Sequence, residues 1–280
     1  MQMTNNSART QTCVKVVTQL QPRNAYLPEP DRRAPFQSEF IPVMIKAVKQ
    51  LRGLLGKRLH SVYVSGDIVW RRAVVNESVL SLTVVCQHAL TLDQSNALNT
   101  LLWRLKTSHS KVISDCHIDI VTVSHVRDLS QIFHWGFFFK HRAICLYGQD
   151  LSASFGLFEA SWEVAKAMNP DISDKLARAK QKITAATTWN TQLNTAQAIA
   201  DTLIRGAFGL VLHKEAYWSE SLNECADAFI KHYPDKKMAI ERLFILLERK
   251  PVKKRAVMTL LNDFGDWLIK EYARIDFKIG

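Results

Sequence analysis

The sequence lacks the marks of a secreted, membrane-spanning or disulfide-rich protein. Its five cysteines are widely spaced and none stands in a CxxC pair, which argues against a disulfide framework and a structural zinc. No apolar run approaches the roughly 18 residues that span a bilayer. The opening residues, MQMTNNSARTQT, contain no apolar segment of the kind found in secretory signals. These absences predict a soluble protein of the reducing cytoplasm.

Common nucleotide-binding and hydrolase motifs are also missing. The chain contains no Walker A sequence, no GxGxxG and no GxSxG, and it has no internal repeat. Acidic residues are in the minority, with 26 against 37 lysines and arginines, so the formal net charge is +11. That surplus predicts an anionic partner, which can be a nucleotide, nucleic acid or an acidic protein.

The first half of the chain has the pattern of a small sheet covered by helices. Residues 1–38 are polar and rich in proline, which predicts an arm. Apolar residues then recur at helical spacing from Phe40 to Gly56, where a glycine suits the end of a helix. The stretches SVYVSG, SVLSLTVVC and HIDIVTVS are rich in β-branched residues and predict strands, with a helix between the last two. FFFKHRAICLYGQDL, residues 137–151, predicts one more strand and a turn.

The second half is patterned almost entirely as helix. Its apolar residues repeat every three or four positions, and the turn signals NPD, YPD and KPV separate the repeats. The sequence therefore predicts an α+β protein: a polar arm over 1–38, a mixed-sheet domain over 39–151 and an all-α helical bundle over 152–280.

Residues 62–86, VYVSGDIVWRRAVVNESVLSLTVVC, consist of a strand, a glycine turn, a short basic segment and a second strand. This layout resembles the core motif of the DNA-polymerase-β-like nucleotidyltransferase superfamily, in particular the antibiotic (aminoglycoside) adenylyltransferases. The family pattern is an apolar strand, Gly-Ser, a connector, and Asp-x-Asp inside the next strand, with a third carboxylate on a later strand. The resemblance extends over most of residues 41–280, because AICLYGQDL and the helical stretch from LIRGAFG to KHYP are also similar to that group.

The resemblance assigns each motif position to one residue of this chain. The family glycine corresponds to Gly66 and its serine to Asp67. The paired strand carboxylates correspond to Val79 and Ser81, and the third carboxylate corresponds to Asp119. Residues two positions apart on a strand point to the same face of the sheet, which is why the family places its paired acids two positions apart.

Nucleotidyl transfer in this superfamily uses ATP and two magnesium ions held by carboxylates, and here the paired carboxylates are absent. Valine offers magnesium no ligand and a neutral hydroxyl offers little. The resemblance leaves Asp119 as the catalytic residue and metal ligand, with Glu77 as the other candidate ligand. Each has a structural alternative: Glu77 suits a solvent-exposed turn, and Asp119 suits an ion pair with a nearby arginine or lysine.

The nucleotide-binding candidates are Gly66, Asp67, Arg71 and Arg72. A turn before a helix favours an anion, and the two arginines can hold phosphate. Asp67, however, brings its own negative charge and is also a good helix cap, and the arginines also suit a solvated basic surface. A zinc site of Cys86, Cys116 and their neighbouring histidines is a further, disfavoured alternative, because cysteines in strands are usually apolar filler.

These observations favour a nucleotidyltransferase-like protein that has lost metal-dependent transfer and acts as a nucleotide-binding or regulatory protein. The first alternative is an active adenylyltransferase that modifies a small-molecule hydroxyl with relocated metal ligands, and it would require Mg²⁺ and ATP. The second alternative is a basic scaffold that binds nucleic acid or an acidic protein.

Overall fold

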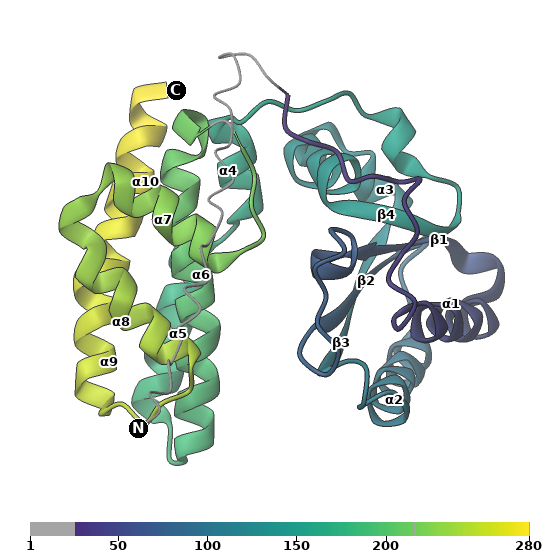
Figure 1. Cartoon of the computed structure of the whole chain (residues 1–280), viewed down its shortest axis with the longest axis horizontal. Coiled ribbons are helices and arrows are strands. Elements are labelled where there is room, and N and C mark those ends of the chain that lie inside the picture. Colours follow the sequence, from purple (N-terminus) through teal and green to yellow (C-terminus); the bar gives the residue numbers. More distant parts are fainter. Residues whose placement is uncertain (1–25, 216, 280) are drawn as a thin grey trace, which may run out of the picture.

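The computed structural model of the chain describes residues 26–215 and 217–279, which form a sheet-containing half and a helical half (Figure 1). The sheet has four strands in the order β3-β2-β1-β4. Strands β2 and β3 are parallel, and β1 is antiparallel to both β2 and β4. The strands are β1 (Leu59–Ser65), β2 (Val79–Cys86), β3 (Asp115–Thr122) and β4 (Ala143–Gly148). The predicted α+β class is confirmed.

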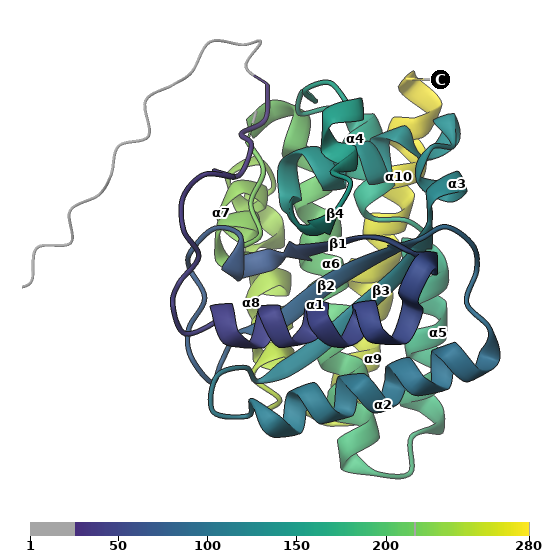
Figure 2. The ribbon, with the colours of Figure 1, turned by 90° about the vertical axis from the view of Figure 1, so that its right-hand side faces the viewer.

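Two helices cover one face of the sheet, α1 (Ile41–Leu55) and α2 (Leu92–Ser108) (Figure 2). They form as predicted: Gly56 ends α1 with a φ of +51°, and Thr91 begins α2 with a capping box that includes Gln94. Alternate residues of β2 enter the core beneath these helices, including Leu80, Leu82 and Val84. Ser81 and Thr83 therefore lie on the opposite face of the sheet.

The segment before β4 differs from the prediction of one continuous strand. Residues 132–142 form two irregular helical turns, Ile132–Gly136 and Phe138–Arg142, and only Ala143–Gly148 is extended. The physical reason is aromatic packing: the Phe139 ring packs against Tyr63 of β1 in a tilted arrangement with ring centres 4.4 Å apart, and the three consecutive phenylalanines are all buried. Short helical turns also follow β3, at α3 (Val123–Val126), and join it to this aromatic cluster.

The helical half is a bundle built around one long helix, α6, which packs against five of the others and supplies many of the buried residues of the core. Gly206 of α6 permits this packing, because a Cβ there would lie 2.4 Å from Ile172 Cδ1 of α5. The helices are α4 (Trp162–Met168), α5 (Ile172–Ala185), α6 (Trp189–Glu215), α7 (Leu222–His232), α8 (Lys237–Leu247), α9 (Lys254–Leu260) and α10 (Asp266–Ile279).

The predicted polar arm is described only from residue 26 onward. Its described part packs against both halves of the molecule: the Leu27 amide donates to the Phe158 carbonyl at 2.8 Å, and Arg32 donates to the Phe139 carbonyl at 3.0 Å. Leu27 is buried in the core of the helical half. In the part of the chain that the structure describes, no helix is long and apolar enough to cross a membrane.

Candidate functional site

A cavity of about 820 Å³ lies between the sheet and the helical half. One wall is the connection from β1 to β2 together with the start of β2, and the other wall is Arg205 of α6 with the segment that leads into α7. Two walls that come from distant parts of the sequence make a concave site of the size that small ligands occupy. The polar lining residues are Asp67, Arg72, Glu77, Ser78, Ser81, Arg205, Ser219, Glu220, Ser221, Asn223 and Glu224.

Four positions of the sequence motif meet in this cavity: Gly66, Asp67, Val79 and Ser81 all line it. Gly66 turns the chain out of β1 with a φ of +79°, a conformation that other residues rarely adopt. β1 pairs Ser65 with Ser81 of β2, which brings this turn beside the start of β2. The glycine turn and the two positions without carboxylates thus form one wall.

Asp67 does not cap a helix, contrary to one of the two predicted roles. The short helical turn Gly66–Ile68 begins one residue earlier, so its N-cap is Ser65 and Asp67 lies inside it. The Asp67 carboxylate instead accepts a hydrogen bond from Ser78 Oγ at 3.4 Å, and Ser78 Oγ accepts one from the Val74 amide at 3.0 Å. This chain of bonds joins the turn to the entry of β2.

Asp119 lies on the predicted face of the sheet but outside the cavity lining. The β2–β3 register pairs it with Thr83, and its carboxylate lies 3.1 Å from His117 Nε2. The Asp119 side chain is 62% exposed, so it needs no buried cation as partner, and within the described residues it forms no ion pair with an arginine or lysine. Glu77 is an exposed turn residue that does line the cavity.

The same register excludes the zinc alternative. Cys86 is paired with Thr122 at one end of the parallel strands, whereas Cys116 is paired with Leu80 at the other end. Six residues of strand separate the two positions, a distance of about 20 Å. Both thiols are buried, and burial raises their pKa values, that of Cys116 to about 12.

The side chains of the adjacent residues Arg71 and Arg72 contact different parts of the protein. Arg71 has a φ of +56°, and its guanidinium turns to the segment 31–36. There it donates to the carbonyls of Asp31 at 2.9 Å and Pro35 at 3.3 Å, and it lies 4.7 Å from the centre of the Phe36 ring. Arg72 lines the cavity and faces Glu224 across it at 3.8 Å.

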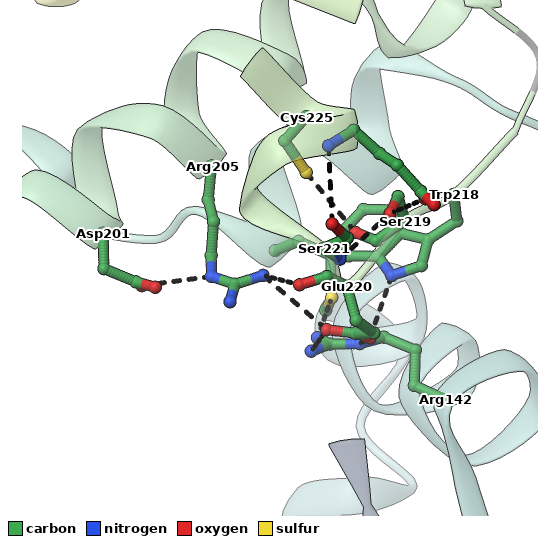
Figure 3. A network of polar contacts seen from close by, with 10 residues as sticks. Arg142, Asp201, Arg205, Trp218, Ser219, Glu220, Ser221 and Cys225 are labelled. Carbon is green, nitrogen blue, oxygen red and sulfur yellow. Dashed lines mark hydrogen bonds and ion pairs between the residues drawn. The ribbon is translucent and has the colours of Figure 1, made fainter. Parts of the chain in front are cut away.

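The helical wall is held by an ionic network centred on Glu220 (Figure 3). Arg142, at the end of the helical turn before β4, makes a two-pronged contact with the Glu220 carboxylate, with one bond at 2.9 Å. Trp218 Nε1 donates to the same carboxylate at 3.0 Å, and Arg205 lies 3.7 Å from it. Burial raises the pKa of Glu220, but Arg142, Trp218 and Arg205 together hold it below its usual value. The network joins the sheet half to the helical half at the cavity.

The sequence pattern does not predict this wall of the site. Glu220 stands within WSESLNECADAFIKHY, part of the half of the chain whose pattern predicts only helices. Ser221 and Glu224, three residues apart before an apolar run, gave a usable signal, because this spacing is typical of a helix N-terminus. Ser221 does cap α7, because its Oγ accepts a hydrogen bond from the Glu224 amide at 3.4 Å. The first turn of α7 lines the cavity.

Comparisons with known proteins agree with this architecture. The chain is similar to the crystal structure of spectinomycin adenyltransferase AAD(9) from Enterococcus faecialis with ATP and spectinomycin, with a TM-score of 0.50 and 13% identity. The match covers 83% of this chain and 99% of that one. The chain has a nucleotidyltransferase-like fold. No protein-family model and no curated protein matches it.

The wall of the cavity that β2 forms has no paired carboxylates to hold two magnesium ions. Val79 and Ser81 line the wall where the superfamily's paired carboxylates are expected. Within residues 26–215 and 217–279, no group of three or more His, Cys, Asp or Glu side chains is placed to hold a metal ion. Magnesium binds through oxygen ligands, chiefly carboxylates and phosphates, and neither Val79 nor Ser81 supplies a carboxylate.

The contrast between Arg71 and Arg72 leads to a paired prediction. We expect Arg71→Ala to lower the free energy of unfolding by about 1–2 kcal/mol, because it removes the bonds to segment 31–36, and to leave ligand binding unchanged. We expect Arg72→Ala to change stability by less than about 0.5 kcal/mol and, if the cavity takes a phosphate-bearing ligand such as ATP, to weaken its binding about ten-fold. Urea unfolding and calorimetric titration measure the two effects. The opposite pattern would contradict the assignment of Arg72 to the cavity.

Proposed function

We propose that this protein binds a nucleotide in the cavity between its two halves and has lost metal-dependent nucleotidyl transfer, so that it acts as a nucleotide-binding or regulatory protein. One observation carries the proposal: Val79 and Ser81 line the cavity where the superfamily's paired carboxylates are expected. The similar adenyltransferase structure was determined with ATP, which supports a nucleotide as the ligand.

The cavity offers groups for each part of a nucleotide. Trp70 and Trp218 supply aromatic surface for a base. The first turn of α7 carries the positive end of a helix dipole, and Arg72 adds a cation, so both suit phosphate. The carboxylates of Asp67 and Glu77 suit the donating hydroxyls of a ribose.

Calorimetric titration with ATP tests the proposal. Since the paired ligands for magnesium are missing, we expect ATP to bind in the presence of EDTA with an affinity within about ten-fold of that measured with magnesium. We also expect no transfer of AMP from labelled ATP to spectinomycin or to related hydroxylated amines. Saturable binding that requires magnesium, together with transfer, would overturn the proposal.

The second candidate is an active adenylyltransferase that acts on a small-molecule hydroxyl with relocated metal ligands. The observation that favours it is that Asp67 and Glu77 both line the cavity: Asp67 accepts a hydrogen bond from Ser78, and Glu77 precedes Ser78 in the sequence. Under this hypothesis, transfer depends on magnesium and Asp67→Asn abolishes it, whereas Asp119→Asn reduces it if Asp119 is the base. The same transfer assay therefore separates the two candidates.

A further inference from the structure

A second concavity lies outside the cavity described above and shares no lining residue with it. It is a groove of about 450 Å³ between helices α5 and α6 of the bundle. Its lining residues are Lys175, Arg178, Ala179, Gln181, Lys182, Thr195, Ala198, Ile199 and Thr202. No carboxylate is among them, although the chain has 26 acidic residues.

The α5 side of the groove is a row of exposed cations. Lys175, Arg178 and Lys182 follow one another at helical spacing, so they lie on one stripe of α5. The rise along the helix axis is about 4.5 Å from the first to the second and about 6 Å from the second to the third. Among the described residues, none of the three makes an ion pair or a side-chain hydrogen bond. Their neighbour Lys180, in contrast, is paired with Asp266 at 2.6 Å.

The α6 side of the groove is small and uncharged. Thr195, Ala198 and Thr202 repeat the same spacing on that helix. Both threonine hydroxyls donate to carbonyls of their own helix, Thr195 at 2.8 Å and Thr202 at 3.0 Å. They are therefore short, neutral side chains that leave the groove open along the helices.

We propose that this groove binds the phosphodiester backbone of single-stranded nucleic acid. A linear polyanion can meet the three cations in turn, and each contact releases counterions. An acidic peptide fits less well, because every nucleotide of a strand carries a phosphate, whereas a peptide needs an acidic side chain at each matching position. No aromatic residue lines the groove, so base stacking does not contribute and binding depends on contacts with the phosphates.

The salt dependence of oligonucleotide binding tests this inference. The probe is a fluorescein-labelled oligo-dT of about 20 nucleotides, followed by anisotropy between 50 and 200 mM salt. Three phosphate contacts contribute about 2 to the slope of log affinity against log salt, or about a 20-fold loss over this range. We expect the triple variant Lys175→Gln, Arg178→Gln, Lys182→Gln to lose that contribution.

The matched control is Lys49→Gln, Arg104→Gln, Lys111→Gln, which removes the same charge from exposed residues in the sheet half. We expect its slope to stay within about 1 of the unchanged protein. Equal losses in both variants would overturn the proposal, because the binding would then follow net charge alone. Binding of a polyglutamate peptide without binding of oligo-dT would overturn it in favour of an acidic protein partner. Thermal unfolding of both variants verifies that they are folded.

Discussion

Replacing Glu220 by glutamine should lower the free energy of unfolding by about 3 kcal/mol. The side chain of Glu220 is only 12% exposed, and it is the carboxylate partner of Arg142, whose side chain is 22% exposed. Glutamine keeps the shape but leaves Arg142 partly buried without a counter-charge, and that loss costs more than an intact pair contributes. Urea unfolding followed by tryptophan fluorescence measures the change.

The matched control for Glu220→Gln is Asp201→Asn on the same network. Asp201 pairs with Arg205 one helical turn away at 3.0 Å, with side chains 40% and 35% exposed. An exposed pair of this kind contributes less than about 1 kcal/mol. If the two substitutions destabilise the protein equally, Glu220 is not the centre of the network.

The effect of Glu220→Gln should also depend on pH. The pKa of Glu220 is lowered in the folded protein, since Arg142, Trp218 and Arg205 outweigh the effect of burial. A carboxylate with a lowered pKa stabilises the fold above its unfolded pKa, and this contribution disappears as the pH falls through the folded value. The difference in stability between the unchanged protein and the variant should therefore be full at pH 7 and shrink in acid.

The fold could be predicted from local patterns because most elements carry their own signal. Strand β2 alternates Leu80, Leu82 and Val84 toward the helices, and α2 begins at its capping residues. The stretch FFFKHR carried no such alternation: an apolar run of this length is compatible with a strand and with a buried helical turn. Contact with Tyr63 of β1, which is distant in sequence, decides in favour of the turns.

The candidate site could be predicted only on the wall that the motif encodes. Gly66, Asp67, Val79 and Ser81 meet in the cavity because one strand, one turn and the next strand bring them together. The different roles of Arg71 and Arg72 depend on a positive φ at Arg71 and on the distant segment 31–36. Neither feature can be derived from two adjacent arginines in a sequence.

Introducing carboxylates at positions 79 and 81 should change the response of the cavity to magnesium. In the double variant Val79→Asp, Ser81→Asp, both new side chains lie two residues apart on one face of β2 and line the cavity. Val79 is 40% exposed, and Ser81 is half-buried, so the sheet should tolerate both changes. We expect ATP to bind at least about ten-fold more tightly with magnesium than with EDTA, which corresponds to about 1.4 kcal/mol.

The neutral control for this variant is Val79→Asn, Ser81→Asn, which has nearly the same shape and no added charge. Four carboxylates and two guanidinium groups already line the cavity, so two more carboxylates should weaken binding of ATP in EDTA while magnesium reverses the loss. The asparagine variant should show neither effect. If both variants respond alike to magnesium, the ions do not bind beside β2, and the absence of paired carboxylates there no longer supports the proposed loss of transfer. A response confined to the aspartates would support the proposal, because it would show that the backbone at positions 79 and 81 can present metal ligands and that Val79 and Ser81 do not.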